Sequence, residues 1–479
     1  MTSQSSGLSG SPSLLPALRR SCLIPARCHI VSFVRSGSPI GPWYARGFGA
    51  WDPQLPSCCV SGACASPAPQ AACTPPALRR PRRERGLAQR RPRKQSRRVA
   101  IVVASEAART QRPRGGGPMR VMLVEDMTAL RGEWSSLFAN DPAATPFASF
   151  EWLSTWCRHW GSGGTPWILT VYDGERLVGL APLMMSRRGG FRFITGLGVG
   201  VGNYWDIIAR AEHRQRVAAE LAAELRRRSA EWDAFFMDKL PEESETRAAL
   251  RAAGLRLDRE RRMPSPRIEL PESFEDYLAG LSSNRRWRLR RYLRAIDEGE
   301  LTVRTVTDAD ELWRAVECWQ SLRADWWSRR GRKMDPEHGS ERFLAFAREA
   351  VTTMAATGHA AVWEVTHRDE VVGVAINFID SSTFYYWLAG FDFRVERLRP
   401  GHALIAAGIR WSIETRRRYF DFMLGDEPYK YHYGPRDRAV LAATVGNPRL
   451  RSRATVGLSH LRHALVPASI RIPFFGRHL

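Results

Sequence analysis

Three neighbouring segments in the last third of the chain are rich in β-branched and aromatic residues. They cover residues 361–366, 371–379 and 383–389, and short polar breaks separate them. Such composition is typical of strands, and the breaks hold Asp and Ser, which favour turns. The pattern predicts an antiparallel meander.

A helical spacing follows this meander. Apolar side chains recur on one face of the segment, at Leu404, Ile405, Ile409, Trp411 and Ile413. Pro400 and Gly401 stand where the helix would begin. We expect a further strand at 419–424 and then a loop at 425–433, called the exit loop here, which carries more titratable side chains than a simple connection needs.

The same order of patterns occurs once before in the chain. Strands are expected at 120–124, 167–172, 176–185, 191–197 and 234–237, and helices at 130–138, 150–160 and 214–228. Val178-Gly179 and Val372-Gly373 occupy equivalent places in the two meanders. Further helices are predicted at 284–298, 312–327 and 341–357, after a link at 264–271.

The repeat predicts the organisation of the chain. We expect an α/β (α+β) protein with tandem domains at residues 119–265 and 266–445, each a mixed, mostly antiparallel sheet flanked by helices. Residues 446–479 are expected to form a C-terminal tail. The earlier copy lacks a basic residue at the turn before its helix, so ligand-binding features are expected in the second copy alone.

Charge changes this picture mainly at the N-terminus. The chain has 72 Lys and Arg against 49 Asp and Glu, a formal net charge of +23. Residues 1–118 hold 19 basic and 3 acidic residues, which leaves 53 and 46 for residues 119–479. The basic excess therefore belongs to the first quarter, and the remainder gives no reason to expect DNA as a partner.

Residues 1–118 are predicted to be a disordered basic and Pro-rich extension. They hold six of the eight Cys, at spacings that match no zinc site, and no metal is expected. Arg19-Arg20 is compatible with a twin-arginine signal, and the Arg-rich composition with a transit peptide. The apolar stretch of such a signal is interrupted, however, and we favour a third interpretation, in which the true start is Met119, because residues 120–124 open globular-looking sequence at once.

No stretch of about 18 apolar residues predicts a membrane span. Only Cys157 and Cys318 remain after residue 118. So few cysteines are compatible with a reducing compartment, and we expect the cytoplasm.

The predicted helix at 284–298 carries six arginines around an apolar line. Arg286, Arg290 and Arg294 share one of its faces. Two interpretations stay open: a solvated charged face, or a surface that binds an anionic ligand through guanidinium groups.

Free backbone N–H groups are expected where the helix after the meander begins at a Gly turn. Such groups, with the helix dipole, favour a pyrophosphate, and Arg397 and Arg399 could add charge-assisted hydrogen bonds. This arrangement resembles the GNAT acyltransferase superfamily. Gly401 and Ala403 match the superfamily's turn, whereas Leu398 stands where Gln or Arg is usual.

A closer resemblance is to CelD-type acetyltransferases with tandem GNAT-like domains, linked with exopolysaccharide or cellulose synthesis. Fem-type aminoacyltransferases of peptidoglycan are more distantly similar. The matching residues are the Arg-rich helix Arg285 to Arg294, Gly390-Phe391-Asp392, Arg399-Pro400-Gly401, Phe420-Asp421-Phe422 and Gly425-Asp426-Glu427-Pro428-Tyr429-Lys430.

The resemblance implies acyl-CoA, such as acetyl-CoA, as co-substrate, with no metal. Its implied binding residues are Arg397, Arg399, Gly401, His402, Ala403 and Leu388, the last on the strand whose backbone N–H would stabilise the thioester oxygen. His402 has a plainer interpretation as an ordinary polar residue at a helix start.

Proton transfer is expected in the exit loop, where the candidates are Tyr429, Lys430, Asp426 and Tyr433. Lys430 is expected to bind a phosphate or carboxylate rather than act as a base. Candidate substrate-binding residues are Arg286, Arg290, Trp387, Asp421 and Glu427. For Asp421, a structural salt bridge is an equal alternative, because a buried carboxylate needs a partner wherever it occurs.

The sequence thus predicts an N-acyltransferase that moves an acyl group from acyl-CoA to an amine of a sugar, peptide or cell-envelope precursor. One alternative is a Fem-like ligase that uses aminoacyl-tRNA, with the Arg-rich helix on RNA phosphates. Another is a GNAT-fold binding protein without catalytic activity.

Overall fold

The computed structural model describes residues 118–465, with side chains as far as residue 457. The predictions for the N-terminal extension and its six cysteines lie outside these residues. The described residues belong to one compact unit of the chain. No helix among them is both long and apolar enough to cross a membrane.

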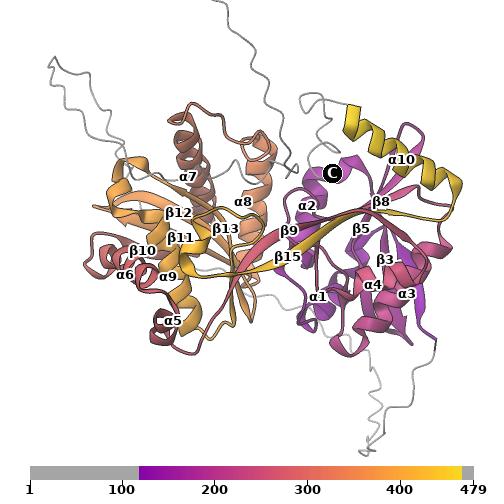
Figure 1. The fold of residues 1–479 in the computed structure, drawn as a ribbon, viewed down its shortest axis with the longest axis horizontal. Coiled ribbons are helices and arrows are strands. Elements are labelled where there is room, and N and C mark those ends of the chain that lie inside the picture. The colour runs from indigo at the N-terminus through magenta and orange to yellow at the C-terminus, as the bar shows by residue number, and fades with distance from the viewer. Residues whose placement is uncertain (1–117, 466–479) are drawn as a thin grey trace, which may run out of the picture. The chain divides into compact units, whose positions relative to one another are not determined.

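The first half of the described chain is drawn from indigo to magenta in Figure 1. In order it contains β1 (Arg120–Val124), α1 (Arg131–Ala139), α2 (Phe150–Trp160), β2 (Thr165–Pro166), β3 (Ile168–Asp173), β4 (Arg176–Ala181), β5 (Leu183–Arg188), β6 (Phe191–Gly196), β7 (Ile208–Ala209), α3 (Arg214–Arg227), β8 (Ala234–Pro241) and α4 (Glu245–Ala252).

The second half begins with a long strand and ends with a helix. It contains β9 (Arg256–Glu269), α5 (Phe274–Gly280), α6 (Ser283–Asp297), β10 (Thr302–Val306), α7 (Ala309–Ser328), α8 (Glu341–Ala356), β11 (Ala360–His367), β12 (Glu370–Ile379), β13 (Thr383–Phe391), α9 (Pro400–Glu414), β14 (Tyr419–Asp421), β15 (Arg436–Gly446) and α10 (Leu450–Leu465). Two 3-10 helices, η5 (Phe393–Leu398) and η6 (Lys430–Tyr433), flank α9 and β14.

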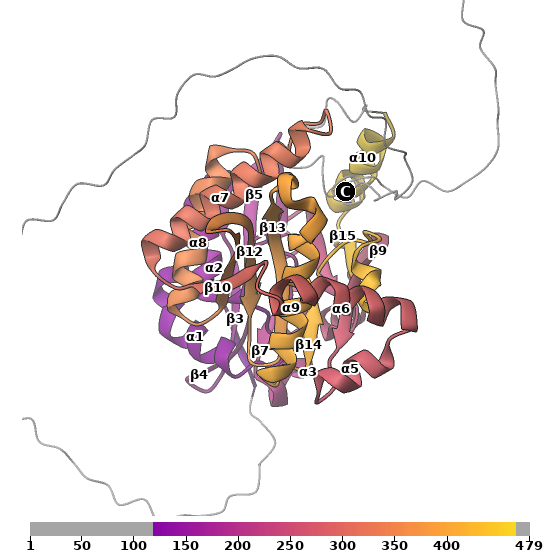
Figure 2. The ribbon, with the colours of Figure 1, turned by 90° about the vertical axis from the view of Figure 1, so that its left-hand side faces the viewer.

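The described strands form a four-stranded antiparallel sheet and an eleven-stranded mixed, mostly antiparallel sheet, and helices flank both, as the sequence predicts for an α/β fold. One sheet has the order β1-β3-β4-β7, and the other the order β10-β11-β12-β13-β14-β9-β15-β8-β6-β5-β2. In Figure 2, α6 and α9 lie in front of the strands β10 to β14. Alternating side chains of β12 serve the two faces: Val374, Ile376 and Phe378 pack with α7 and α8, whereas Val372 and Ala375 pack with α6 and α9.

The internal repeat extends to an irregularity in the strands. The pairing of β3 with β4 skips Val178, and that of β11 with β12 skips Val372, so both Val-Gly pairs contain a β-bulge. A Cβ on Gly179 would lie 2.3 Å from Val217 of α3, and one on Gly373 would lie 2.7 Å from Val365. Both glycines are therefore required by close packing.

Three boundaries differ from the sequence prediction. The strand expected at 176–185 is two strands in different sheets, because Pro182 interrupts it and turns its carbonyl to Trp205 Nε1. The strand expected at 419–424 ends at Asp421, since Met423 has a φ of 56°. The link expected at 264–271 belongs largely to β9.

Two prolines inside β9 give that strand the sequence pattern of a link. Pro264 and Pro266 lack the N–H group that a ladder needs. The Pro264 carbonyl accepts a hydrogen bond from Gly425 N, and the Pro266 carbonyl accepts one from Phe422 N. In a strand, the N–H of a residue points the same way as its carbonyl. The missing donors therefore face the exit loop, and the ladder between β9 and β15 is kept. The proposed domain boundary at residues 265 and 266 falls inside this strand.

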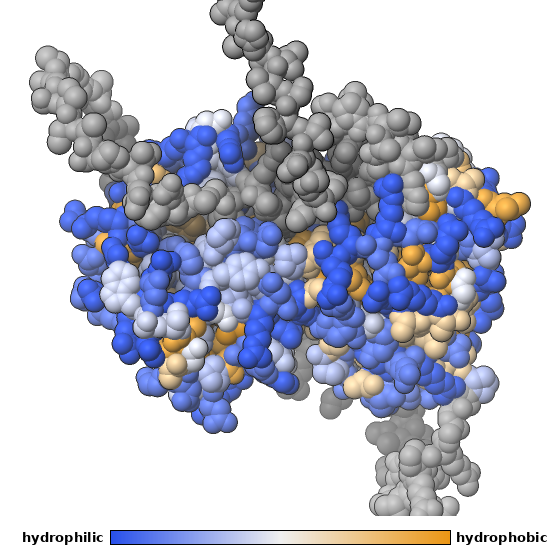
Figure 3. Space-filling model, in the orientation of Figure 1, coloured by the Kyte–Doolittle hydropathy of each residue, from blue (hydrophilic) through white to orange (hydrophobic). Residues whose placement is uncertain are grey.

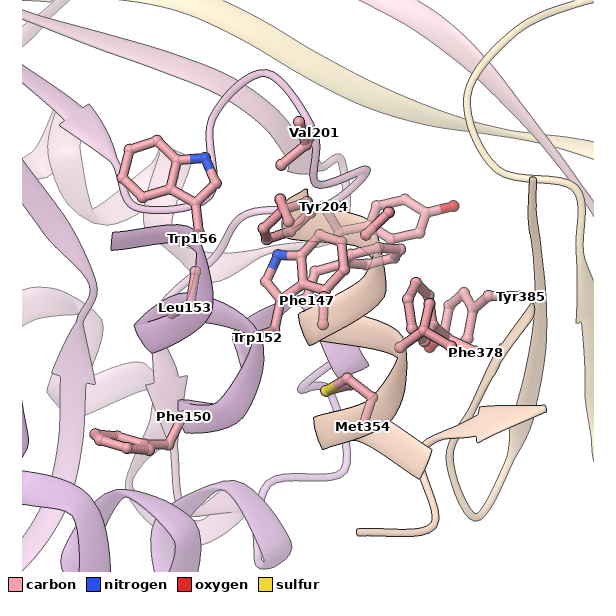
Figure 4. Close-up of a cluster of buried hydrophobic side chains, with 14 of the residues drawn as sticks. Phe147, Phe150, Trp152, Leu153, Trp156, Val201, Tyr204, Met354, Phe378 and Tyr385 are labelled. Carbon is pink, nitrogen blue, oxygen red and sulfur yellow. The ribbon is translucent and has the colours of Figure 1, made fainter. Parts of the chain in front are cut away.

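An aromatic cluster joins elements from both halves (Figure 4). Trp152 of α2 lies edge to face against Phe346 of α8 and Phe378 of β12, with ring centroids 5.0 and 5.2 Å apart. Phe147 contacts Phe378 and Tyr385 in the same way. Trp152 and Trp156 of α2 thus belong to the core. The expected tail at 446–479 contains α10, whose Val456 packs with Ala234 and Phe236 of β8.

Candidate functional site

A pocket lies where the end of α7, strand β13, the start of α9 and the exit loop meet. Four residues predicted from the sequence line it: Arg399, Gly401, His402 and Tyr429. The other lining residues are Trp326, Arg330, Tyr386, Phe391, Asp392, Phe393, Glu396, Pro400, Ile405, Pro428 and His432. The lining is apolar and aromatic, with charged groups of both signs.

Helix α9 begins with an open N-terminus at this pocket. Arg399 takes the N-cap place in the left-handed conformation, with φ 54° and ψ 52°, and makes no side-chain cap bond. Pro400 has no N–H, and Ala403 donates the first intrahelical bond to the Arg399 carbonyl at 3.0 Å. The N–H groups of Gly401 and His402 therefore lie before the helical ladder starts. A Cβ on Gly401 would lie 2.5 Å from the ring of Phe391, which explains the glycine.

Strand β13 presents an unpaired edge beside the pocket. Its parallel pairing with β14 covers only Thr383 to Tyr385. Beyond this point the register with β12 passes from Tyr386 to Leu388, so Trp387 is the extra residue of a β-bulge. Backbone groups near Leu388 thus have no β14 partner, in agreement with the role that the resemblance implies for this segment.

The side chain of Trp387 points into the core. Its ring centroid lies 4.9 Å from that of Phe378 and 5.4 Å from that of Trp152. Leu388 packs against the same cluster, and Ala403 is fully buried. Their contribution to a site would therefore come from the backbone.

Lys430 holds the exit loop in place. Its side chain is 3 % exposed, and Nζ donates to the carbonyls of Met423, Leu424 and Gly425 at 3.2, 2.9 and 3.1 Å. Glu427 Oε2 lies 2.8 Å from the same nitrogen. Burial lowers the pKa of Lys430, and the charge of Glu427 opposes this. Lys430 is expected from the sequence to bind a phosphate or carboxylate of a ligand; in the structure it pairs with Glu427 of its own loop and does not line the pocket.

Gly425 makes this arrangement possible. Its φ is 114°, and a Cβ there would lie 2.6 Å from Glu427 Oε2. Any other residue would be strained and would displace the carboxylate. Asp426, by contrast, is exposed and does not line the pocket.

His402 and Tyr433 form a buried neutral pair at the pocket. His402 Nδ1 lies 2.7 Å from the Tyr433 hydroxyl, and Tyr292 of α6 stacks on the imidazole with ring centroids 4.4 Å apart. Burial, aided by the positive charges of His432, Arg399 and Arg288, lowers the pKa of His402 to about 3. Burial also raises the pKa of Tyr433 well above its usual value. Both groups are therefore uncharged at neutral pH.

Tyr429 keeps its proton in the pocket. Burial raises the pKa of its phenol well above the usual value, and the nearby charges of Glu427 and Tyr386 act in the same direction, against that of Arg323. A protonated phenol on a pocket wall can donate a hydrogen bond or a proton to a ligand atom.

Asp421 lies away from the pocket, at the junction of the two halves. It is fully buried, and both carboxylate oxygens lie 2.9 Å from the Tyr204 hydroxyl. Met423 N donates at 2.6 Å, and Arg438 Nη1 lies 3.9 Å away. Burial raises the pKa of Asp421, and Arg438 opposes this. These contacts favour the structural interpretation of this carboxylate.

Three of the predicted arginines, unlike Arg399, lie outside the pocket lining. Arg397 is exposed on η5. Arg290 is exposed on α6, and Arg286 is half-buried with Nη1 3.4 Å from the Leu278 carbonyl. Within residues 118–465, no group of three or more His, Cys, Asp or Glu side chains is placed to hold a metal ion.

Several lining residues were not identified from the sequence. Trp326 lies at the end of α7 and Arg330 just after it, about seventy positions before the α9 turn, and no local pattern connects them with it. Tyr386 and Phe391 belong to a strand whose splay from β14 has no sequence signature. Pro428 and His432 could have been found, since both lie in the exit loop.

The splayed strands, the bulge and the open helix terminus together define a GNAT-like fold. Residues 283–431 match the family model described as an acetyltransferase (GNAT) domain. No curated protein matches the chain.

Solved structures with a similar fold include FemX, with 12% identity and a TM-score of 0.49 over 67% of this chain and 96% of that one. The C-terminal domain of a putative lysylphosphatidylglycerol synthetase from Agrobacterium fabrum has 11% identity and a TM-score of 0.43 over 70% of this chain and 98% of that one. A tandem GNAT protein from the clavulanic acid biosynthesis pathway has 15% identity and a TM-score of 0.39, over 69% and 100%.

Proposed function

We propose that residues 266–445 catalyse transfer of an acyl group from acyl-CoA to an amine of a sugar, peptide or cell-envelope precursor, as in CelD-type acetyltransferases. The observation that carries this proposal is the pocket in which the open N-terminus of α9 faces the unpaired edge of β13. The helix N-terminus can bind phosphate, and the strand edge can stabilise a thioester oxygen.

The pyrophosphate of the donor fits the start of α9. The N–H groups of Gly401 and His402 and the helix dipole favour an anion there. Arg399 and Arg330 line the same pocket. The lining carboxylate of Asp392 is already paired, since its Oδ2 accepts a hydrogen bond from Arg394 Nε at 2.8 Å. Glu396 is the lining group that opposes an anion. Burial raises its pKa, against the charges of Arg330 and Arg399.

Acyl-CoA would supply the thioester, and the residues of this chain would handle charge and protons. A backbone N–H near Leu388 would stabilise the oxygen as the amine attacks the carbonyl carbon. Tyr429 would donate its proton to the sulfur as the carbon–sulfur bond breaks, and the phenolate would regain a proton from solvent, because burial disfavours its negative charge. The proton lost by the amine would leave past the exit loop, on whose surface Asp426 is exposed.

Two further assignments belong to this proposal. The first half would form a wall of the acceptor side, since it meets the second half at Tyr204 and Asp421. The cytoplasm is the proposed compartment, which agrees with Cys157 and Cys318 both being free thiols.

Calorimetric titration with acetyl-CoA tests the donor. We expect Arg399→Asn to weaken binding roughly tenfold, because a hydrogen bond to a charged group contributes about 1.5–3 kcal/mol and Asn tolerates the left-handed conformation. Arg397→Asn is the matched comparison, and its effect should be smaller because Arg397 is exposed. Glu396→Gln should strengthen binding.

The same titration with charged tRNA separates the alternatives. Binding of charged tRNA but not acetyl-CoA would identify an aminoacyl ligase, and binding of neither would identify a protein without this donor chemistry. If acetyl-CoA binds, release of free thiol with amino-sugar and peptide amines in turn identifies the acceptor class.

A further inference from the structure

Helix α6 exposes a face made of one tryptophan and three arginines. Leu289, Tyr292 and Leu293 are buried on its inner side. Trp287 lies on the outer side, and Arg290, Arg291 and Arg294 follow it by three, four and seven positions, which places all four on one face. All four are exposed, and Trp287 is 57% exposed. We call these four residues the outer face of α6.

The charge of this outer face is only partly neutralised. Arg294 Nε lies 3.9 Å from Glu298 Oε1, a weak exposed pair, while the other acidic residue at this end, Asp297, pairs with Arg410 at 3.0 Å. Arg290 has no ion pair within the described residues. Arg291 stacks over Trp287, with Cζ 5.5 Å from the ring centroid. An indole held among guanidinium groups therefore faces the solvent.

The partner that fits this face is flat and anionic. In Figure 2, α6 lies at the front, beside α5 and α9, and the part of Figure 3 around it is largely hydrophilic. None of the four residues of this outer face lines the pocket at the site. A convex helix can touch a plane along its length. Tryptophan prefers the headgroup level of a bilayer, and arginine binds phosphate oxygens.

A bilayer fits better than single-stranded RNA. Bases stack on free aromatic faces, and Arg291 already covers one face of Trp287. The N-terminal sequence adds charge of the same sign, with 19 basic against 3 acidic residues in 1–118. Clustered basic residues are attracted to anionic lipids.

We propose that the outer face of α6 docks the protein on membranes that contain anionic phospholipids. The same helix packs behind two lining residues of the pocket, because Tyr292 stacks on His402 and Arg288 Nη1 lies 3.4 Å from His432 Nε2. Since a helix is about 10 Å across, docking brings the pocket close to the headgroups. This inference concerns where the protein works and does not depend on the identity of the acyl donor.

Co-sedimentation of the full chain with vesicles tests the docking. We expect binding to phosphatidylcholine vesicles in which roughly a third of the lipid is phosphatidylglycerol. Binding to vesicles of phosphatidylcholine alone should be much weaker. The double variant Arg290→Glu/Arg291→Glu should bind at least about tenfold more weakly, because each basic residue near an anionic surface contributes about a factor of five. Trp287→Ala should weaken binding by a smaller factor.

Helix α7 offers a matched control. Trp313 is 48% exposed and has Arg348 Cζ 5.8 Å from its ring centroid, so Trp313→Ala and Arg314→Glu/Arg342→Glu alter similar groups elsewhere. These controls should bind like the wild type. Circular dichroism melting confirms that each variant is folded, and Arg290→Gln/Arg291→Gln provides a milder second pair.

Three outcomes would overturn the proposal. The wild type does not sediment with anionic vesicles; the α6 variants bind as well as the wild type, which would assign binding to residues 1–118; or the α6 variants lose retention of bulk tRNA on a filter while vesicle binding is unchanged. The last result would identify RNA as the partner of the outer face.

Discussion

At the scale of single residues, His402 shows how burial sets the state of the site. Its imidazole is held between Tyr292 and the Tyr433 hydroxyl, at the start of a helix whose dipole disfavours a cation. Arg288 and Arg399 add positive charge nearby, and the pKa falls to about 3. Because the imidazole is neutral, the N-terminus of α9 is free to favour an anion without a titrating cation beside it.

This shift predicts a pH dependence of stability. The folded pKa of His402 is below its ordinary value of 6.5, so its contribution is present above pH 6.5 and is lost as the pH falls toward 3. Between pH 6.5 and 4.5 the loss is about 2–3 kcal/mol, at about 1.4 kcal/mol per unit. Urea unfolding of His402→Gln should show a correspondingly smaller loss over this range.

His432 titrates in the same direction, because burial and Arg288 also lower its pKa. The variant His402→Gln should therefore reduce the acid sensitivity without removing it. Equal acid sensitivity in the wild type and the variant would show that the imidazole of His402 is not held neutral by its surroundings.

Residue types and local turns were predictable where the chain itself supplies the environment. Pro400 and Gly401 start α9 as expected, because a fixed φ and a missing Cβ act locally. The pocket neighbours Trp326 and Tyr386 were not predictable, since they meet α9 only through tertiary packing. The pair that Lys430 forms with Glu427 was not predictable either, because it depends on the turn at Gly425.

At the scale of elements, the exit loop depends on one buried amine. Lys430 contributes the donors for three carbonyls that no strand partner satisfies, and its charge pairs with Glu427. The loop in turn carries Tyr429 to the pocket wall and Tyr433 to His402. The position of both phenols therefore rests on this network.

Lys430→Met should destabilise the protein by about 3–5 kcal/mol, because it leaves a buried carboxylate and three carbonyls without a partner. The free energy of unfolding in urea measures this change. Adding Glu427→Gln should restore part of the loss, since the buried charge is then removed as well. A Lys430→Met protein as stable as the wild type would mean that the carbonyls find other donors.

Element types were predicted better than element boundaries. Periodicity predicts the meander of β11, β12 and β13 and the helices α6 to α9, because each element either has one buried face or is an apolar strand. Pro182, Met423 and the prolines of β9 altered boundaries through backbone geometry that periodicity does not contain. The splay of β13 from β14 likewise has no local signal.

At the scale of the whole described chain, the two copies share a sheet and a polar junction. Strand β15 pairs with both β8 and β9, so the last strand lies between elements of each half. Beside it, Tyr204 reaches from the first half to Asp421 and to Ser265 Oγ at 2.6 Å. Arg438 of β15 lies over the ring of Tyr204 with Cζ 5.2 Å from its centroid. We expect the halves to unfold in one transition.

Tyr204→Phe tests this junction. The change leaves the ring and removes the donor to a buried carboxylate, so the free energy of unfolding should fall by about 1–3 kcal/mol. In a double-mutant cycle with Asp421→Asn, the double variant should lose less stability than the sum of the two single losses, because both variants break the same bond. Tyr172→Phe removes a hydroxyl whose bond to Glu133 is exposed, and should change stability by less than about 0.5 kcal/mol. Two separate unfolding transitions in the wild type, with Tyr204→Phe altering only one of them, would show that the junction does not couple the halves.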